Sequence, residues 1–183
     1  MKDTILAAAI EEVTLRGLRF TMQDLATRLR VSKRSIYENF SSKEELVSYM
    51  VDAILTDMST QEQAILEVKT SCINRLEQLL TVHPYEAEMF NKNIYEDLRR
   101  FFPKQWQKVE AARQLRLQRI EQLLESGITA RELRPVNVGL ISEVIKCSFD
   151  SFTSYHFLEQ NKLTYKEAME SLLSIMLEGI AIK

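Results

Sequence analysis

The chain has 183 residues, 45% of them hydrophobic, and its 24 Lys or Arg against 26 Asp or Glu give a net charge of −2. This length allows one large or two small compact units with a packed core, and no apolar run is long enough to cross a bilayer. Only four Gly and three Pro are present, which favours long helices. Without a secretion signal, we expect a cytoplasmic protein whose two cysteines, Cys72 and Cys147, are buried as small apolar groups.

The first predicted helix runs from about Asp3 to Leu15, with Gly17 as its C-terminal stop. A second helix follows, for which Thr21 is a candidate N-cap. Asp24, three residues later, completes a capping box. The apolar face of this second helix consists of Met22, Leu25, Ala26 and Leu29.

A third, short helix begins after Ser32, the next candidate N-cap. Helical spacing directs Ile36, Tyr37 and Phe40 toward the interior. The outward side chains are polar or charged: Lys33, Arg34, Ser35, Glu38 and Asn39. Two amphipathic helices around a tight turn, with a free polar face on the second, are typical of a DNA-reading helix-turn-helix.

Basic residues gather in this part of the chain. From Arg16 to Lys43 there are seven Lys or Arg against two acids, a local charge of +5, whereas the remaining residues carry −7 because the whole chain carries −2. A third cap, Ser42 with Glu45, begins another helix and directs Lys43 and several backbone N–H groups outward, which suits a phosphate oxygen. The segregated charge favours DNA binding over the alternative, an ordinary antiparallel helix pair in a bundle.

An ordered set of residues extends over the first quarter of the chain: Ile5, Ala8, Ala9, Gly17, Thr21, Leu25, Ala26, Val31, Ser32, Ile36, Tyr37, Phe40, Lys43, Glu44 and Leu46. This set resembles the N-terminal DNA-binding pattern of the tetracycline-repressor (TetR) family of transcriptional regulators. Three positions depart from that pattern: Arg30 and Ser35, where smaller residues are common, and Asn39, where histidine is frequent. We expect Arg30 to adopt a left-handed backbone, at a cost of about 1 kcal/mol relative to Gly.

The resemblance implies a homodimer on a palindromic DNA operator. We expect Lys33, Arg34 and Ser35 to meet base edges, with Arg34 donating two parallel hydrogen bonds to guanine. Gln23 is expected to reach a flanking base. The family pattern implies that phosphates are held by Thr21, Tyr37, Asn39 and Lys43. The predicted DNA-binding residues are therefore Thr21, Gln23, Ser32, Lys33, Arg34, Ser35, Tyr37, Asn39 and Lys43.

The fourth predicted helix runs from Ser42 to about Met58, with a break at Ser59 and Thr60. Later helices are expected at about Gln61–Val82, Tyr85–Phe101, Lys104–Glu125, Val138–Gln160 and Tyr165–Ile180, punctuated by Pro84, Pro103, Gly127 and Pro135. The expected fold class is therefore all-α, with about nine helices. Residues 1–46 form a three-helix helix-turn-helix DNA-binding domain, joined through the fourth helix to a bundle over residues 47–183 for effector binding and dimerisation.

Two late helices carry broad faces of apolar and small residues, which could belong to an internal core or to an interface. Regulators of the TetR family pair through their two final long helices, so the resemblance favours a homodimer with a four-helix seam. We expect this interface to contain Val144, Cys147, Ser151, Tyr155, Leu172, Ile175, Met176 and Gly179. A two-fold dimer would place two recognition helices on successive major-groove faces of a palindrome.

Aromatic and Met side chains cluster in the middle of the chain. Their simplest interpretation is hydrophobic core, whereas the family resemblance favours an effector pocket between helices. The candidate lining residues are Met89, Phe90, Phe102, Trp106, Phe149 and Phe152. We expect a small, largely apolar effector that changes the setting of the fourth helix and so alters operator affinity.

An enzyme is the rival class. His83 and His156 are the only histidines, and the sequence has no Gly-rich phosphate loop, HExxH pair, nucleophile elbow or CxxC. His156 and Glu159 share a helical face but lack the second carboxylate-and-histidine helix of a di-iron bundle. We predict no catalytic residue, metal, cofactor or membrane partner, and a DNA-binding regulator with repression as the family's usual mode. The alternative is an all-helical binding or enzymatic domain without sequence-specific DNA recognition.

Overall fold

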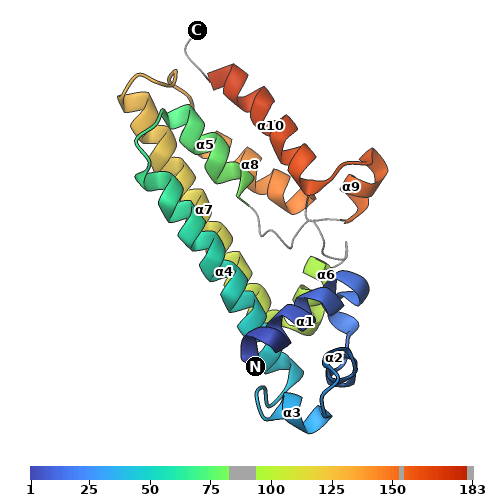
Figure 1. Ribbon diagram of the computed structural model, residues 1–183. Coiled ribbons are helices and arrows are strands. Elements are labelled where there is room, and N and C mark those ends of the chain that lie inside the picture. Colours follow the sequence, from blue (N-terminus) through green and yellow to red (C-terminus); the bar gives the residue numbers. More distant parts are fainter. Residues whose placement is uncertain (83–93, 153–154, 181–183) are drawn as a thin grey trace. The chain divides into compact units, whose positions relative to one another are not determined.

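The computed structural model describes residues 1–82, 94–152 and 155–180, with the backbone alone at 155, 156, 179 and 180. These residues form ten α-helices and one 3-10 helix and contain no strand, so the all-α class is confirmed. The elements are α1 (Lys2–Arg16), η1 (Gly17–Arg19), α2 (Met22–Leu29), α3 (Lys33–Tyr37), α4 (Lys43–Glu67), α5 (Cys72–Thr81), α6 (Ile94–Phe101), α7 (Pro103–Thr129), α8 (Val138–Phe152), α9 (Tyr155–Asn161) and α10 (Tyr165–Ile180) (Figure 1). None of the described helices is both long and apolar enough to span a membrane.

The chain divides into two compact units. The first combines Met1–Thr56 with Pro84–Glu110, and the second combines Asp57–His83 with Ala111–Lys183. The first unit therefore adds α6 and the start of α7 to the helix-turn-helix segment. The predicted boundary at residue 47 separates a DNA-binding function from an effector-binding function and does not separate two compact units. It stays a prediction.

The helix starts of the first unit follow the predicted capping chemistry. Thr21 Oγ1 accepts the N–H of Asp24 at 3.2 Å and Asp24 Oδ2 accepts the N–H of Thr21 at 2.7 Å, so the capping box is confirmed. Ser32 Oγ accepts the N–H of Ser35 at 3.0 Å. At the start of α4, Ser42 Oγ accepts the N–H of Glu45 at 3.1 Å, while the Glu45 carboxylate turns to Ser41.

Two left-handed residues shape the chain around α2. Gly17, at φ 64°, ends α1 as predicted. Arg30, at φ 54° and ψ 39°, ends α2, so the expected left-handed turn is confirmed. The turn brings α3 back against α2.

The core of the first unit joins the helix-turn-helix to α4 and α6. Fully buried side chains from α1 to α4, and from the segment that joins α3 to α4, form it together with Leu98 of α6: Ile5, Ala9, Val13, Leu25, Ile36, Phe40, Leu46 and Val47. The prediction that Tyr37 points toward the interior is wrong. Its side chain is 43% exposed, because α3 is one turn long and packs mainly through Ile36.

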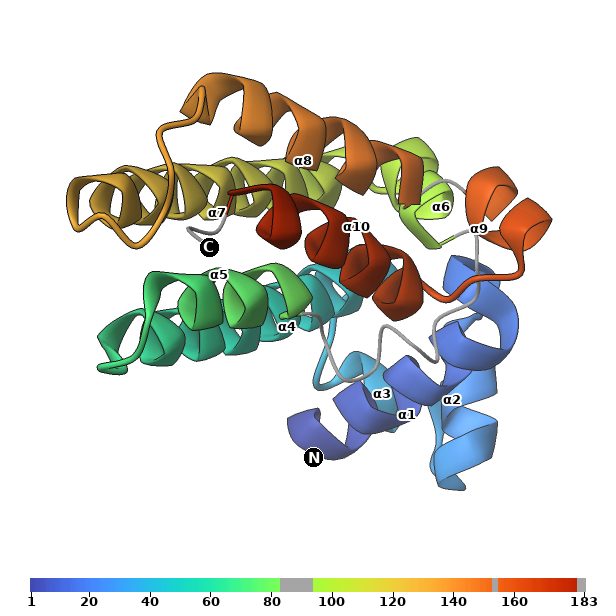
Figure 2. The same cartoon turned by 90° about the horizontal axis from the view of Figure 1, so that it is seen from above.

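The second unit has its own core, to which α5, α7, α8 and α10 contribute. Its most buried members include Leu76, Leu79, Ile120, Leu124, Ile145, Phe149, Met169 and Leu173. The last helix packs against α5 (Figure 2). Its predicted span, Tyr165–Ile180, is confirmed.

The predicted break at Ser59 and Thr60 is wrong, since α4 continues to Glu67. Glu62, two residues after the predicted break, is buried in an ion pair with Arg116, and such a tertiary contact outweighs the weak local preference of Ser and Thr. The chain turns instead before Ser71, whose Oγ accepts the N–H of Asn74 at 3.2 Å and caps α5.

Gly127 does not end a helix, because α7 continues to Thr129. A Cβ at Gly127 would lie 2.4 Å from Cys72 Sγ, so the glycine permits α5 and α7 to approach closely. Of the predicted helix at Val138–Gln160, α8 covers Val138–Phe152 and α9 begins at Tyr155, while residues 153–154 lie outside the described chain. Of the predicted helix at Tyr85–Phe101, residues 85–93 lie outside the described chain and the remainder is α6.

Candidate nucleic-acid interface

The exposed face of α3 is cationic at its first turn. Lys33 and Arg34 directly follow the Ser32 cap, and the Arg34 side chain is 88% exposed. Its Nε donates to Glu38 Oε1 at 3.1 Å, one helical turn away. Within the described chain, the two terminal amino groups of Arg34 have no hydrogen-bond partner, so they are available to an acceptor pair such as guanine O6 and N7.

Ser35 and Asn39, two departures from the family pattern, bond within their own helix. Ser35 Oγ lies 2.8 Å from Ser32 Oγ, and Asn39 Nδ2 donates to the Ser35 carbonyl at 2.9 Å. Both side chains are half-buried. They therefore fix the ends of α3, and their predicted contacts to DNA stay a prediction.

Tyr37, Gln23 and Thr21 line the exposed surface beside α3. Lys33 Nζ lies 5.8 Å from the centroid of the Tyr37 ring, within the range of a cation–π contact. Gln23 is exposed on α2 and reaches Thr27 Oγ1 at 3.5 Å. Thr21 Oγ1 donates to Asp24 Oδ2 at 2.8 Å, so its hydroxyl serves the helix cap.

Lys43 differs from its expected outward position. Its ammonium donates to the carbonyl of Leu18 and lies 4.5 Å from the centroid of the Phe20 ring. Burial lowers the pKa of Lys43, while Asp97 and Asp24 act in the opposite direction. Lys43 is thus half-buried, with its ammonium against η1.

Two cations counted in the basic segment are neutralised by acids of α1 and α2. Arg28 donates to Glu12 and Glu11, each at 2.7 Å, and Arg16 bonds to Asp24 at 3.2 Å. Sequence counting missed the Arg28 pairs because the acids of α1 precede the counted segment. Within residues 16–43, the exposed cations that take part in no salt bridge of the described chain are Arg19, Arg30 and Lys33, and the first two were not among the predicted DNA-binding residues.

The comparison with known families agrees with this geometry. A family model described as "Bacterial regulatory proteins, tetR family" matches residues 5–50, which extend from α1 into α4. The N-terminal segment of the chain thus matches the TetR family. The resemblance to TetR-family transcriptional regulators seen in the sequence is confirmed.

Similarity to known proteins extends over the whole chain. The chain is 25% identical over 181 residues, 98% of its own length and 95% of the relative's, to "Uncharacterized HTH-type transcriptional regulator YvaF" of Bacillus subtilis (strain 168). A putative transcriptional regulator from Saccharomonospora viridis in complex with choline matches 100% of this chain and 98% of its own, with 16% identity and a TM-score of 0.82. The regulator FadR from Bacillus subtilis in complex with stearoyl-CoA matches 98% and 99%, with 19% identity and a TM-score of 0.72.

The predicted effector residues lie in two different hydrophobic clusters. Phe102 and Trp106 pack against the core of the first unit, whereas Phe149 and Phe152 belong to the second. Met89 and Phe90 lie outside the described residues. The effector site therefore stays a prediction.

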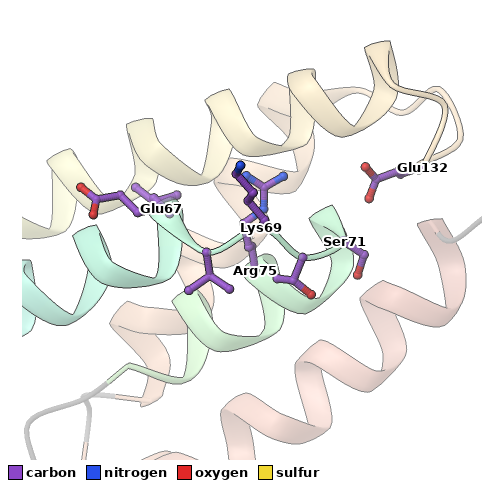
Figure 3. A pocket seen from close by; sticks show the side chains of 8 residues that line it. Glu67, Lys69, Ser71, Arg75 and Glu132 are labelled. Carbon is purple, nitrogen blue, oxygen red and sulfur yellow. The ribbon is translucent and has the colours of Figure 1, made fainter.

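An open, polar depression lies where α4 turns into α5 in the second unit (Figure 3). It is lined by Leu66, Glu67, Val68, Lys69, Thr70, Ser71, Arg75 and Glu132, and none of these is a predicted effector residue. Glu132 accepts the N–H of Cys72 at 2.5 Å, so a carboxylate of the chain itself already occupies the start of α5. This lining does not match a site for a largely apolar molecule.

The predicted dimer residues belong to α8, α9 and α10, and only some of them are exposed, since Leu172 and Met176 pack against the core of the second unit. Val144 is 42% exposed and Ile175 is 74% exposed, while Ser151, Leu172 and Met176 are half-buried. Cys147 is exposed, so its predicted burial is wrong for this chain alone, whereas Cys72 is buried as expected. The side chains of Tyr155 and Gly179 lie outside the described residues, and Leu140, exposed one turn before Val144, was missed.

Proposed function

We propose that the protein binds a palindromic DNA operator as a homodimer and represses transcription until a small effector releases it. The observation that carries this proposal is the capped helix α3, which presents Arg34 with both terminal amino groups available. A recognition helix with an exposed cation at its first turn is the arrangement that a major groove accepts.

The apolar outer faces of α8 and α10 support the dimer. Ile175 and Val144 are large aliphatic side chains exposed to water on the second unit, together with Leu140. Leu140 and Val144 lie one helical turn apart on α8, and exposed apolar surface of this kind usually marks an interface. Pairing these faces between two copies would bury them and hold two α3 helices for the two halves of a palindrome.

A small, largely apolar effector would act through the second unit. Two structural neighbours are complexes, one with choline and one with stearoyl-CoA, which supports a ligand site in this fold. Differential binding to two settings of α4 would couple the effector to DNA by about 1 to 3 kcal/mol. We propose no enzymatic activity, no cofactor and no membrane partner, and we place this function in the cytoplasm.

Selection from random duplexes tests the proposal. Purified protein should enrich a palindrome, and light scattering should give twice the mass of one chain. Arg34→Ala serves as the matched control, because it removes the proposed base contact and should enrich a palindrome that is degenerate at one position of each half-site. Enrichment of no duplex, or a single protomer in solution, would overturn the proposal in favour of a helical domain without DNA recognition.

A further inference from the structure

Lys43 has an internal binding site in the first unit. It stands in the first turn of α4, and its ammonium donates to the carbonyl of Leu18 in η1. Two aromatic rings face the ammonium: the centroid of Phe20 lies at 4.5 Å and that of Phe102 at 5.8 Å. A carbonyl and two ring faces together hold the cation at the interior side of the helix start.

Asp97 of α6 adds a negative charge to this internal site. It is nearly buried, and its helix packs against η1, which carries the Leu18 carbonyl. Its charge favours the ammonium form of Lys43 against the opposing effect of burial, and Asp24 acts in the same direction. Because a nearly buried carboxylate without a cation is costly, Asp97 resists the departure of Lys43.

We infer that Asp97 restrains DNA binding by holding Lys43 in competition with an operator phosphate. The inference rests on the proposed function, in which Lys43 is a phosphate ligand. Lysine is a compact charge on a flexible four-carbon stem, so its ammonium can move from Leu18 to solvent without moving the helix. Binding the operator then requires the hydrogen bond between Lys43 and the Leu18 carbonyl to break. The Asp97 carboxylate also loses the nearby positive charge of Lys43.

Asp97→Asn tests this restraint, because it removes the charge while keeping the shape. Affinity for the selected palindrome is measured by fluorescence anisotropy over a range of salt concentrations. We expect Asp97→Asn to bind roughly fivefold or more tightly than the natural chain, a typical coupling between linked sites. The slope of log affinity against log salt should stay the same, since the number of phosphate contacts does not change.

Asp52→Asn is the matched control. Asp52 lies in the same unit and pairs with Lys108 at 2.7 Å, so its substitution makes the same change of net charge without touching Lys43. Lys43→Met is the second variant of the test. It should reduce the salt slope by about one per half-site, and in its background Asp97→Asn should no longer raise affinity.

Three outcomes would overturn the inference. An equal gain from Asp52→Asn and Asp97→Asn would show a general charge effect, and a gain that persists with Lys43→Met would show that Asp97 acts elsewhere. An unchanged salt slope in Lys43→Met would show that Lys43 stays internal on DNA, although sequence-specific binding would survive. Failure of the natural chain to prefer any duplex would instead remove the proposed function. Asp97→Ser gives the same neutralisation if Asn is not tolerated, as judged by thermal unfolding.

Discussion

Arg116 of α7 donates its Nε to Glu62 of α4 at 2.6 Å, with both side chains buried. Arg119 donates to the other oxygen of the same carboxylate, and Arg116 Nη1 donates to the carbonyl of Val82 at 3.0 Å. One carboxylate therefore compensates two arginines within the second unit. Its loss would leave two cations in a low-dielectric interior, which is far more costly than the loss of a surface pair.

Glu62→Ala should accordingly reduce the free energy of unfolding by about 3 to 5 kcal/mol. Urea unfolding followed by circular dichroism measures it. Glu143→Ala is the control, because Glu143 forms an exposed pair with Lys146 at 3.2 Å and should change stability by less than about 1 kcal/mol. Equal effects from the two variants would contradict the importance of burial at Glu62.

Arg34→Ala should relax the preference for one base in each half-site, at about 1 to 3 kcal/mol of lost discrimination. The reason is that Arg34 offers two donors that match a guanine edge. Arg19→Ala is the comparison, since Arg19 is an exposed cation outside α3 and should weaken all sequences alike. Binding to a panel of duplexes that differ at single positions measures both, and a uniform loss from Arg34→Ala would speak against base reading.

Arg30→Gly should stabilise the protein by up to about 1 kcal/mol, because φ 54° suits glycine better than arginine. Thermal unfolding measures the change. Arg19→Gly should instead destabilise the protein, because Arg19 has no left-handed backbone and glycine there only adds conformational freedom to the unfolded chain. A loss of stability in both variants would mean that the Arg30 side chain contributes more than its backbone costs.

Acid should weaken the start of α2. Hydrogen bonds from Thr21 lower the pKa of Asp24, so this carboxylate stabilises the folded state at neutral pH and the contribution disappears as pH falls through the folded-state pKa. Asp24→Asn should therefore flatten the loss of stability in the acid range. Denaturant unfolding at a series of pH values measures the slope, and an unchanged slope in Asp24→Asn would contradict this role of the carboxylate.

Ile175→Asp should separate the proposed dimer into single protomers, because it places a charge in the apolar seam. Light scattering measures the mass. Leu15→Asp is a matched control, as Leu15 is 62% exposed on α1 and lies outside the predicted interface. Dissociation by both substitutions would point to general unfolding, and dissociation by neither would remove α10 from the interface.

The local chemistry of the helix-turn-helix could be predicted from the sequence, because each signal acts over a few residues. The Thr21 capping box and the left-handed Arg30 depend only on neighbours within four positions. Tyr37 was harder, since a helix of one turn has too few contacts for periodicity to decide which side chains are buried.

Features that depend on distant residues could not be predicted. The continuity of α4 through Ser59 depends on Arg116, which is 54 positions from Glu62. The role of Gly127 depends on Cys72, which is far away in the sequence. From the sequence alone, a glycine that ends a helix cannot be distinguished from one that allows another helix to pack closely. The predicted DNA contacts depend on groups outside the chain, so they stay predictions.

The close approach at Gly127 has a practical consequence for the thiols. Cys72 is sealed in the core and burial raises its pKa, whereas Cys147 is open to solvent on α8. A maleimide dye should therefore attach to a single protomer at Cys147 and leave Cys72 unlabelled, without any mutation. Because Cys147 belongs to the predicted interface, slower labelling at higher protein concentration would report that α8 is covered on assembly.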